Sequence, residues 1–501
     1  MRKKNFIVFL AMMLAAAIFV SCGPTQDGGG TGGADDTQDG GGTQQQTEEG
    51  GNNIGDPDAE WLASVTPNLP DITFDGVSFN ILNSDQESAV WLLKQLEAEE
   101  LTGEVFNDAV YHRNRAVEER LNIEIRETIA ADQGMVRTRA QMNIRAGAHE
   151  FDLYMLHGGY TMTLAQDGSL IDYHDIPHVD LSRIYWCQDM QRDLSFGGRL
   201  FAMAGDFSFT HYSATIVMFF NKGIHSDLLL DCPYELVHRG QWTFDAFHNQ
   251  ARQAYMDLDG NGIFDHNDQF GYMSLYFLMY PSFVIAGGER YLTKDEFDIP
   301  MLAIGGDRFV NVYHAVLDMM HHSNMVFDAG HNHRLQDIMF PGNQVLFWSE
   351  LMNWARILRE MENDFGILPH PKFDEHQENY HSIVFGGHFM AIPSTTYDIA
   401  RTGVILEALS AYSRRMVMPV YYDIVLSTVI ARDEESGEML DIIFANRTYD
   451  MAQQFFSGSV FGPFNARARA NNPDVSSFLD RYSQAIEREI ERWADRLAAV
   501  G

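Results

Sequence analysis

Apolar residues recur along this chain with two different periods, and stretches of the two kinds alternate. Short, continuous apolar runs predict buried strands at residues 77–82, 151–156 and 215–221. Repeats close to 3.6 residues predict helices at 105–121 and 474–500. Strands that alternate with helices favour an α/β fold with a largely parallel sheet. Such sheets bind ligands in the crevice beyond the carboxyl ends of their strands.

Weaker signals add further elements in the same alternation. Strands are expected at 123–125, 344–347 and 385–393, and helices near 135–146, 243–256 and 397–412. Thr243 is expected to cap the helix that follows it, because its hydroxyl can accept a hydrogen bond from the first turn. In the last helix, Ser477 and Asp480 have the spacing of a capping box.

The first residues have the pattern of an export signal. Arg2, Lys3 and Lys4 precede an apolar run at 6–20 that ends in Ser21-Cys22. A cysteine directly after a small residue resembles the lipobox of bacterial lipoproteins, so we expect a signal peptide at 1–21 and lipidation of Cys22. No other apolar run approaches the ~20 residues that a spanning helix needs. The expected location is therefore the extracytoplasmic face of the cell membrane, with a lipid anchor.

Residues 22–58 continue from this cysteine as a Gly-rich, acidic stretch without Lys or Arg. So few apolar residues cannot bury enough surface to order the chain, which predicts a disordered linker between the anchor and a folded body.

Length and charge narrow the function classes. A chain of 501 residues is too long for one ordinary core, so two domains are expected. Its net charge of −35 argues against a nucleic-acid partner, since a phosphate backbone needs Lys and Arg. Apart from Cys22, only Cys187 and Cys232 are present, and the sequence leaves open whether they pair.

The sharpest motif is DLDGNGIFDHND at 257–268. Counted from Asp257, its oxygen donors fall at positions 1, 3, 5, 7, 9 and 12 of an EF-hand-type calcium loop, and Gly262 is at position 6. The expected ligands are Asp257, Asp259, Asn261, the backbone carbonyl of Ile263, Asp265 and Asp268. Ca²⁺ prefers six to eight oxygen ligands, so this spacing predicts a structural calcium ion. The alternative is a Gly-rich surface turn without metal.

Several segments, in their order along the chain, resemble the extracellular solute-binding proteins of ABC transporters, the sugar-type family 1 group. They are GEVFNDAVYHRNRAVEERLNIEI, DGSLIDYHDIPHVDLSRIYW, FFNKGI, GQWTFDAF, the calcium motif and FGILPHPKFDEHQENY. The resemblance implies a type II periplasmic-binding-protein fold, in which two α/β lobes close on a ligand about a hinge. It divides the chain into one lobe at 71–211 and 386–446 and a second at 212–385 and 447–501.

The same resemblance implies which loops face the cleft between the lobes. The expected ligand-binding residues are Asn83, Asp85, His157, Tyr160, Tyr276, Tyr280, Trp348 and Glu350. Aromatic faces suit the C–H surfaces of a sugar, and carboxylates and amides suit its hydroxyl groups. Structural roles compete with this interpretation: Trp348, Tyr160, Tyr276 and Tyr280 as core, Asp85 as a helix cap and His157 as a turn residue.

The leading hypothesis is a monomeric, non-enzymatic receptor that captures an oligosaccharide and delivers it to an ABC importer permease. A glycoside hydrolase is the rival class, although 70 acidic residues produce carboxylate pairs by chance. The chain lacks the GxSxG, HExxH and P-loop motifs. A third hypothesis is a peptide-binding receptor of the same fold.

Overall fold

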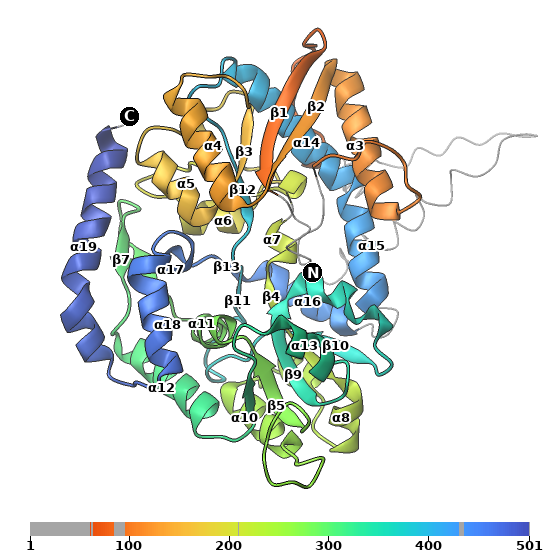
Figure 1. The fold of residues 1–501 in the computed structure, drawn as a ribbon, viewed down its shortest axis with the longest axis vertical. Helices are drawn as coiled ribbons and strands as arrows, with labels where there is room; N and C mark the ends of the chain where they lie inside the picture. The colour runs from red at the N-terminus through yellow and green to blue at the C-terminus, as the bar shows by residue number, and fades with distance from the viewer. Residues whose placement is uncertain (1–60, 62–63, 85–95, 209, 430–434, 500–501) are drawn as a thin grey trace, which may run out of the picture. The chain divides into compact units, whose positions relative to one another are not determined.

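Two separate β-sheets organise the body of the chain (Figure 1). The computed structural model describes residues 61, 64–84, 96–208, 210–429 and 435–499, and the compact unit considered below is Ser64–Gly501. The expected signal peptide, Cys22, the linker and Asp85 lie outside the described residues. Within the described part, every helix is too short or too polar to cross a lipid bilayer.

The first sheet has the strand order β12-β3-β1-β2. Its strands are β1 (Val77–Ser84), β2 (Ile123–Ala130), β3 (Leu153–His157) and β12 (His388–Ala391). Strand β1 runs parallel to β2 and β3, while β12 runs antiparallel to β3. The central strand β3 is buried on both faces, which explains its unbroken apolar run, whereas the edge strand β2 begins with buried and exposed residues in alternation.

Helices pack around this first sheet. They are α3 (Val105–Leu121), α4 (Gln133–Arg145), α5 (Gly158–Ala165), α6 (Gln188–Leu194) and α14 (Ile399–Met416). Helix α14 packs against α3, and α4 packs against β1 and β3. We call this sheet with its helices lobe 1.

The second sheet has the strand order β10-β4-β9-β5-β8. Its strands are β4 (Ile216–Asn221), β5 (Phe270–Ser274), β8 (Val326–Asp328), β9 (Val345–Leu351) and β10 (Phe365–Leu368). The helices between them are α8 (Lys222–Asp227), α9 (Pro233–His238), α10 (Phe244–Ala251), α11 (Tyr276–Ala286), α12 (Asp307–His321) and α13 (His333–Met339), and the hairpin is β6 (Leu292–Lys294) with β7 (Pro300–Leu302). Strands β8, β5 and β9 are mutually parallel, and β4 is antiparallel to both β9 and β10. We call this layer lobe 2.

Three backbone segments connect the lobes. The first passes through α7 (Thr210–Ser213) into β4, the second contains β11 (Ser382–Ile383) and the third contains β13 (Arg447–Thr448). Strands β11 and β13 are parallel partners, and the Phe385 amide donates to the Ala214 carbonyl across 2.9 Å. Together they form the hinge that the two-lobed interpretation requires.

The C-terminal part runs through α15 (Met418–Val429), α16 (Glu435–Ala445), α17 (Met451–Gln454), the π-helix Ser457–Phe461, α18 (Gly462–Arg469) and α19 (Val475–Ala499). Helix α16 packs on lobe 2, because the Ser436 hydroxyl accepts the Ile367 amide of β10 at 3.0 Å and lies 2.9 Å from the Tyr234 hydroxyl. Helix α16 therefore packs with lobe 2, although the expected boundary places residues up to 446 in lobe 1.

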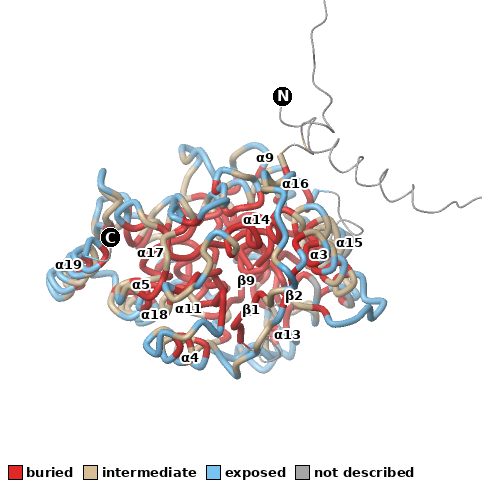
Figure 2. The backbone as a smooth tube through the Cα atoms, turned by 90° about the horizontal axis from the view of Figure 1, so that it is seen from above, coloured by how far each residue is buried: buried red, intermediate tan, exposed pale blue. Residues whose placement is uncertain are grey.

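The last helix carries the apolar stripe expected of it. Phe478, Ile486, Ile490 and Leu497 are buried along one face. Its amino end is held by Asp474, whose carboxylate accepts the Ser477 amide at 3.0 Å, so Asp474 takes the capping place expected of Ser477. Figure 2 shows the strands and α14 in the buried interior, with exposed faces on α4 and α19.

The expected strands and helices are confirmed at each of the segments described. Thr243 caps α10, since its hydroxyl accepts the Ala246 amide at 3.3 Å. Cys187 and Cys232 do not form a disulfide in this structure, and they differ in exposure, since Cys187 is buried and Cys232 is exposed.

Helix α14 comes very close to the backbone of another segment at Gly403. A Cβ at Gly403 would lie 1.9 Å from the Pro177 carbonyl oxygen, so the helix can pack here only without a side chain. We expect Gly403→Ala to lower the free energy of unfolding by about 1–3 kcal/mol through overpacking, despite the helix preference of alanine. Urea unfolding measures this, and Gly306→Ala, whose Cβ would meet nothing within 4 Å, is the control. Equal stability of the two variants would contradict the close approach.

Candidate functional site

A group of polar side chains marks the carboxyl edge of the lobe 1 sheet. Gln133, at the start of α4, joins two strands: its Nε2 donates to Ser84 Oγ at 2.9 Å, and its Oε1 accepts the His157 amide at 2.8 Å. His157 ends β3, and its ring lies 6.1 Å from that of Tyr160 in the first turn of α5. The Arg137 guanidinium lies 4.6 Å from the centre of the Tyr160 ring.

The imidazole groups at this edge are neutral. Burial lowers the pKa of His157, and it lowers the pKa of its cross-strand partner His388 to about 3, with a further contribution from His157. Neutral imidazoles can each donate and accept a hydrogen bond, which suits a ligand rich in hydroxyl groups.

A second group lies at the carboxyl edge of the lobe 2 sheet. Tyr276 opens α11 directly after β5, and its hydroxyl is 3.0 Å from His331 Nε2 in the loop after β8. The Arg469 guanidinium covers the Tyr276 ring at 3.9 Å and forms an ion pair with Asp328 at 3.4 Å. The next residue, Phe277, stacks on His331 with ring centres 5.4 Å apart.

Both groups border the same segment of the hinge. A Cβ on Gly386 would lie 4.0 Å from His157 Nε2, and the Phe277 ring lies 5.9 Å from that of Phe385. Gly386 and Gly387 have φ of 84° and 127°, conformations that favour glycine, so the backbone here passes between the lobes without side chains. The two sheet edges therefore face the hinge together, and we define the candidate site as His157, Tyr160, Tyr276, Phe277 and His331.

Solved structures resemble the fold of this chain, although no protein-family model and no curated protein matches the sequence. An ABC substrate-binding protein of Listeria monocytogenes, solved in complex with cycloalternan, is 11% identical, with 82% of this chain and 100% of that chain covered at a TM-score of 0.53. The cyclic α-maltosyl-1,6-maltose binding protein of Arthrobacter globiformis is 12% identical, with 85% and 99% covered and a TM-score of 0.56. UgpB of Mycobacterium tuberculosis, in complex with glycerophosphocholine, is 15% identical, with 83% and 99% covered and a TM-score of 0.54.

The chain has the fold of ABC substrate-binding proteins. At these identities the likeness concerns the fold, so the chemistry of the site rests on the residues of this chain.

In this substrate-binding-protein fold, Trp348 and Tyr280 do not face the space between the lobes. Trp348 is fully buried in β9, with the rings of Phe219, Phe340 and Trp354 5.2–5.7 Å away. Tyr280 is one turn into α11 and stacks on His321. The expectation for these two residues is corrected. The side-chain alternation of β9 turns Trp348 into lobe 2. Tyr280 shares a face of α11 with Tyr276 but lies one turn further along, where its ring is buried against His321.

Glu350 and Asn83 are also buried, and both are hydrogen-bonded inside their lobes. Glu350 accepts the Leu351 amide at 2.9 Å and the Gln336 side chain at 3.0 Å. Asn83 donates to Glu127 at 2.7 Å and accepts the Ser84 amide at 2.9 Å. Because these hydrogen bonds occupy both buried side chains within their own lobes, the structure gives Glu350 and Asn83 a structural role.

Gln454 is a site neighbour that the sequence pattern missed. Its Nε2 donates to the Val384 carbonyl of the hinge at 3.2 Å, and a Cβ on Gly158 would lie 2.7 Å from its Oε1. The π-helix Ser457–Phe461 follows shortly afterwards, and such turns occur frequently at functional sites. The sequence gives no sign of Gln454, because the helix that it ends is only four residues long and shows no periodicity. His331 lies in a loop and Arg469 at the end of a short helix, so they also lack a distinguishing pattern.

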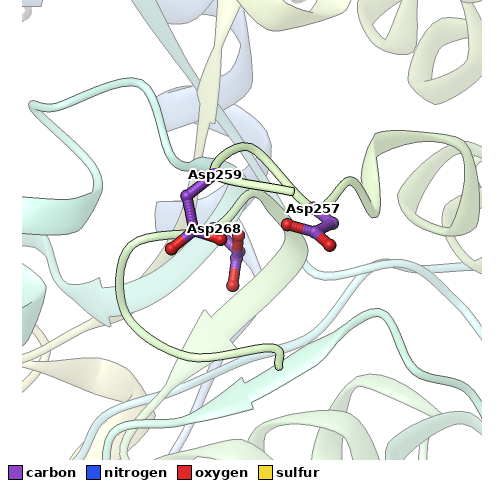
Figure 3. A group of neighbouring side chains, drawn as sticks. All are labelled: Asp257, Asp259 and Asp268. Carbon is purple, nitrogen blue, oxygen red and sulfur yellow. The ribbon is translucent and has the colours of Figure 1, made fainter. Parts of the chain in front are cut away.

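The 257–268 loop lies apart from this site, between the 3₁₀ helix Arg252–Ala254, which follows α10, and strand β5. Figure 3 shows Asp257, Asp259 and Asp268 directed toward one another, and one ligand atom from each lies within 4.8 Å of the others. Asn261 and Asp265 instead bond within the loop: Asn261 Nδ2 donates to Asp259 at 2.6 Å, and Asp265 accepts from Asn267.

The chemistry of the donor set fits a divalent cation. The Asp268 carboxylate is fully buried, and no Lys or Arg occurs from 253 to 289 to neutralise the four aspartates. Backbone amides of Gly262 and Gly260 hold the pKa of Asp257 below its usual range, so it is ionised and ready to ligate.

A polar groove of about 420 Å³ lies elsewhere, beside α6 and the β6–β7 hairpin. It is lined by His174, Gln188, Gln191, Arg192, Ser195, Gly198 and Asp298. None of these residues belongs to the candidate site or to the residues expected to bind ligand.

Glu350 makes stability depend on pH. Burial raises its pKa from 4.5 to about 7, so its contribution to stability is lost as the pH rises from about 4.5 to about 7. We expect Glu350→Gln, which cannot ionise, to gain stability relative to the wild type between pH 5 and pH 8, measured by urea unfolding at both values. The exposed Glu119→Gln is the control. A difference that stays constant with pH would show that Glu350 is not the buried acid described.

Proposed function

We propose that the chain is an extracytoplasmic solute-binding receptor that captures a carbohydrate of oligosaccharide size between its lobes and delivers it to the permease of an ABC importer. One observation carries this proposal: a histidine–tyrosine pair at the carboxyl edge of each sheet borders the same hinge segment. Closure about that hinge would bring the two pairs onto opposite sides of one solute.

The chemistry of the pairs suits carbohydrate. Aromatic faces can pack on the C–H surfaces of sugar rings, and neutral imidazoles and phenols can bond to hydroxyl groups. The Listeria protein of the same fold binds cycloalternan in its solved complex, and the Arthrobacter protein is a binding protein for cyclic α-maltosyl-1,6-maltose, which supports this class of solute. The glycerophosphocholine complex of UgpB shows that the fold also accepts a solute with a phosphate group.

Binding is favoured over catalysis by the state of the nearby carboxyl groups. Glycoside hydrolysis uses two carboxyl groups placed on either side of the bond to be broken. Here Asp328 forms an ion pair with Arg469, and Glu127 accepts a hydrogen bond from Asn83. Both carboxyl groups are thus engaged with neighbours within one lobe.

We extend the proposal to the parts outside the site. Lipidation of Cys22 would anchor the receptor, and residues 22–58 would tether its body to the membrane. Calcium bound by Asp257, Asp259 and Asp268, with Asn261, the Ile263 carbonyl and Asp265 as further ligands, would order the connection from α10 to β5. The ion would have a structural role, because the loop lies away from the candidate site.

The solute class can be tested by thermal shift and calorimetry with linear and cyclic oligosaccharides, and with di- to pentapeptides as the opposing set. We expect an oligosaccharide to raise the melting temperature without release of reducing sugar. Tyr276→Ala should weaken its affinity about 10-fold, the effect of losing one aromatic contact. Tyr482→Ala, on α19, is the control. Stabilisation by peptides alone, or release of reducing sugar by the wild type, would overturn the proposal.

Calcium can be tested on the same protein. A ligand that binds only the folded state raises the free energy of unfolding by about 2.7 kcal/mol when its free concentration is about 100 times the dissociation constant. EDTA should therefore lower the melting temperature, and added Ca²⁺ should restore it. Asp257→Ala should abolish this response, whereas Asp318→Ala, which removes an exposed carboxylate elsewhere, should keep it. A wild type whose melting temperature ignores EDTA would refute the calcium ligands.

A further inference from the structure

Arg137 is a half-buried cation at the candidate site, and it has no anionic partner among the described residues. It lies on α4 and stacks on the Tyr160 ring at 4.6 Å. Among the described residues its Nε is buried with no hydrogen-bond partner, and the guanidinium forms no ion pair. Its two terminal nitrogens also have no partner there, and they are not buried. An arginine in this state has lost hydration without gaining a compensating acceptor.

Arg139, two residues further on the same helix, shows what is missing. It also stacks on an aromatic ring, that of Phe151 at 4.8 Å. Unlike Arg137, it forms an ion pair with Glu150. The two arginines share helix, stacking and neighbourhood, and differ in whether the protein supplies a carboxylate.

The arginine at the other edge of the site follows the paired pattern. Arg469 stacks on Tyr276 at 3.9 Å and has Asp328 as its partner at 3.4 Å. Of these three stacked arginines, the one without a carboxylate is the one beside His157 and Tyr160.

The surrounding charge makes this omission informative. The chain has 70 acidic and 35 basic residues, so carboxylates outnumber the basic groups that could pair with them. His157, whose ring lies beside that of Tyr160, and its cross-strand partner His388 have lowered pKa values and are neutral. At physiological ionic strength, screening over roughly 8 Å weakens the repulsion between a bound anion and any carboxylate that lies farther away than this distance. A short-range contact with a guanidinium can therefore bind an anionic group on an acidic protein.

We infer that the solute is an acidic carbohydrate whose anionic group, a carboxylate or a phosphate, binds the Arg137 guanidinium beside Tyr160. This inference rests on the proposed receptor function and specifies its solute. The planar fork of arginine matches both kinds of anion, and its charge-assisted hydrogen bonds are among the stronger ones in proteins. The anion would supply the partner that the described residues do not.

The test compares acidic sugars with neutral counterparts of the same size. The probes are oligogalacturonides and oligoalginates of two to five units, their fully methyl-esterified forms, sugar phosphates, and neutral malto- and cello-oligosaccharides. Thermal shift followed by calorimetry at 50 and 300 mM NaCl measures binding to the full chain. We expect an acidic probe to bind, its ester or dephosphorylated form to bind at least 10-fold more weakly, and added salt to lower the affinity. Comparing the uronic-acid oligosaccharides with the sugar phosphates shows whether the anionic group is a carboxylate or a phosphate.

Variants assign the effect to Arg137. Arg137→Gln should lower the affinity for the acidic probe about 10- to 100-fold and remove most of its salt dependence, as expected for one charge-assisted contact. Arg137→Lys should keep part of the affinity, and Arg139→Gln should keep all of it. Without solute, Arg137→Gln should lower the melting temperature less than Arg139→Gln does, because each variant loses a stacked guanidinium but only the second also loses an ion pair.

Two further results would separate the inference from the receptor function. If the tightest solute is neutral and Arg137→Gln binds it as well as the wild type does, the inference is overturned and the receptor function stands. If no carbohydrate binds the wild type at all, the receptor function itself fails as proposed, and this inference fails with it.

Discussion

Backbone pairing of the three segments between the lobes is the constraint on which the rest of this structure depends. The Phe385 amide bonds to Ala214, the Val384 amide bonds to Thr448, and β11 pairs with β13. Because these bonds join chain positions far apart in sequence, they bring the edges of two independent sheets to one place. His157 and Phe277 belong to different lobes and still border neighbouring residues of the same segment.

Much of the fold was accessible from the sequence because local patterns determine local elements. The apolar run of β3 and the 3.6-residue repeat of α3 each reflect a surface that must be buried, and Thr243 caps α10 through a bond three residues away. The lobe boundary was less accessible, since the position of α16 depends on Ser436 meeting β10 through tertiary contacts.

The site was predictable only in part, for a related reason. Residues that follow strands of a parallel sheet gather at its carboxyl edge, so His157, Tyr160 and Tyr276 could be expected there. Whether an aromatic ring points into the space between lobes or into a lobe depends on register and rotamer, and Trp348 and Tyr280 point inward. Arg137 could not be singled out from the sequence, because what distinguishes it is that no described residue supplies its guanidinium with a carboxylate, and this is visible only in the structure. The 257–268 loop is the opposite case, because its ligand-like spacing can be read from the sequence and the carboxylates of Asp257, Asp259 and Asp268 lie close together in the structure.

The buried imidazoles of lobe 1 have a consequence for where such a receptor could work. A histidine whose pKa stays at its usual value would gain a charge as its surroundings acidify from pH 7 to pH 5. His388, with a pKa of about 3, resists this change, and burial shifts the pKa of His157 in the same direction. The neutral form of His388 is thereby kept across mildly acidic and neutral media. A receptor that meets media of different acidity would present the same uncharged imidazole at this position of the edge.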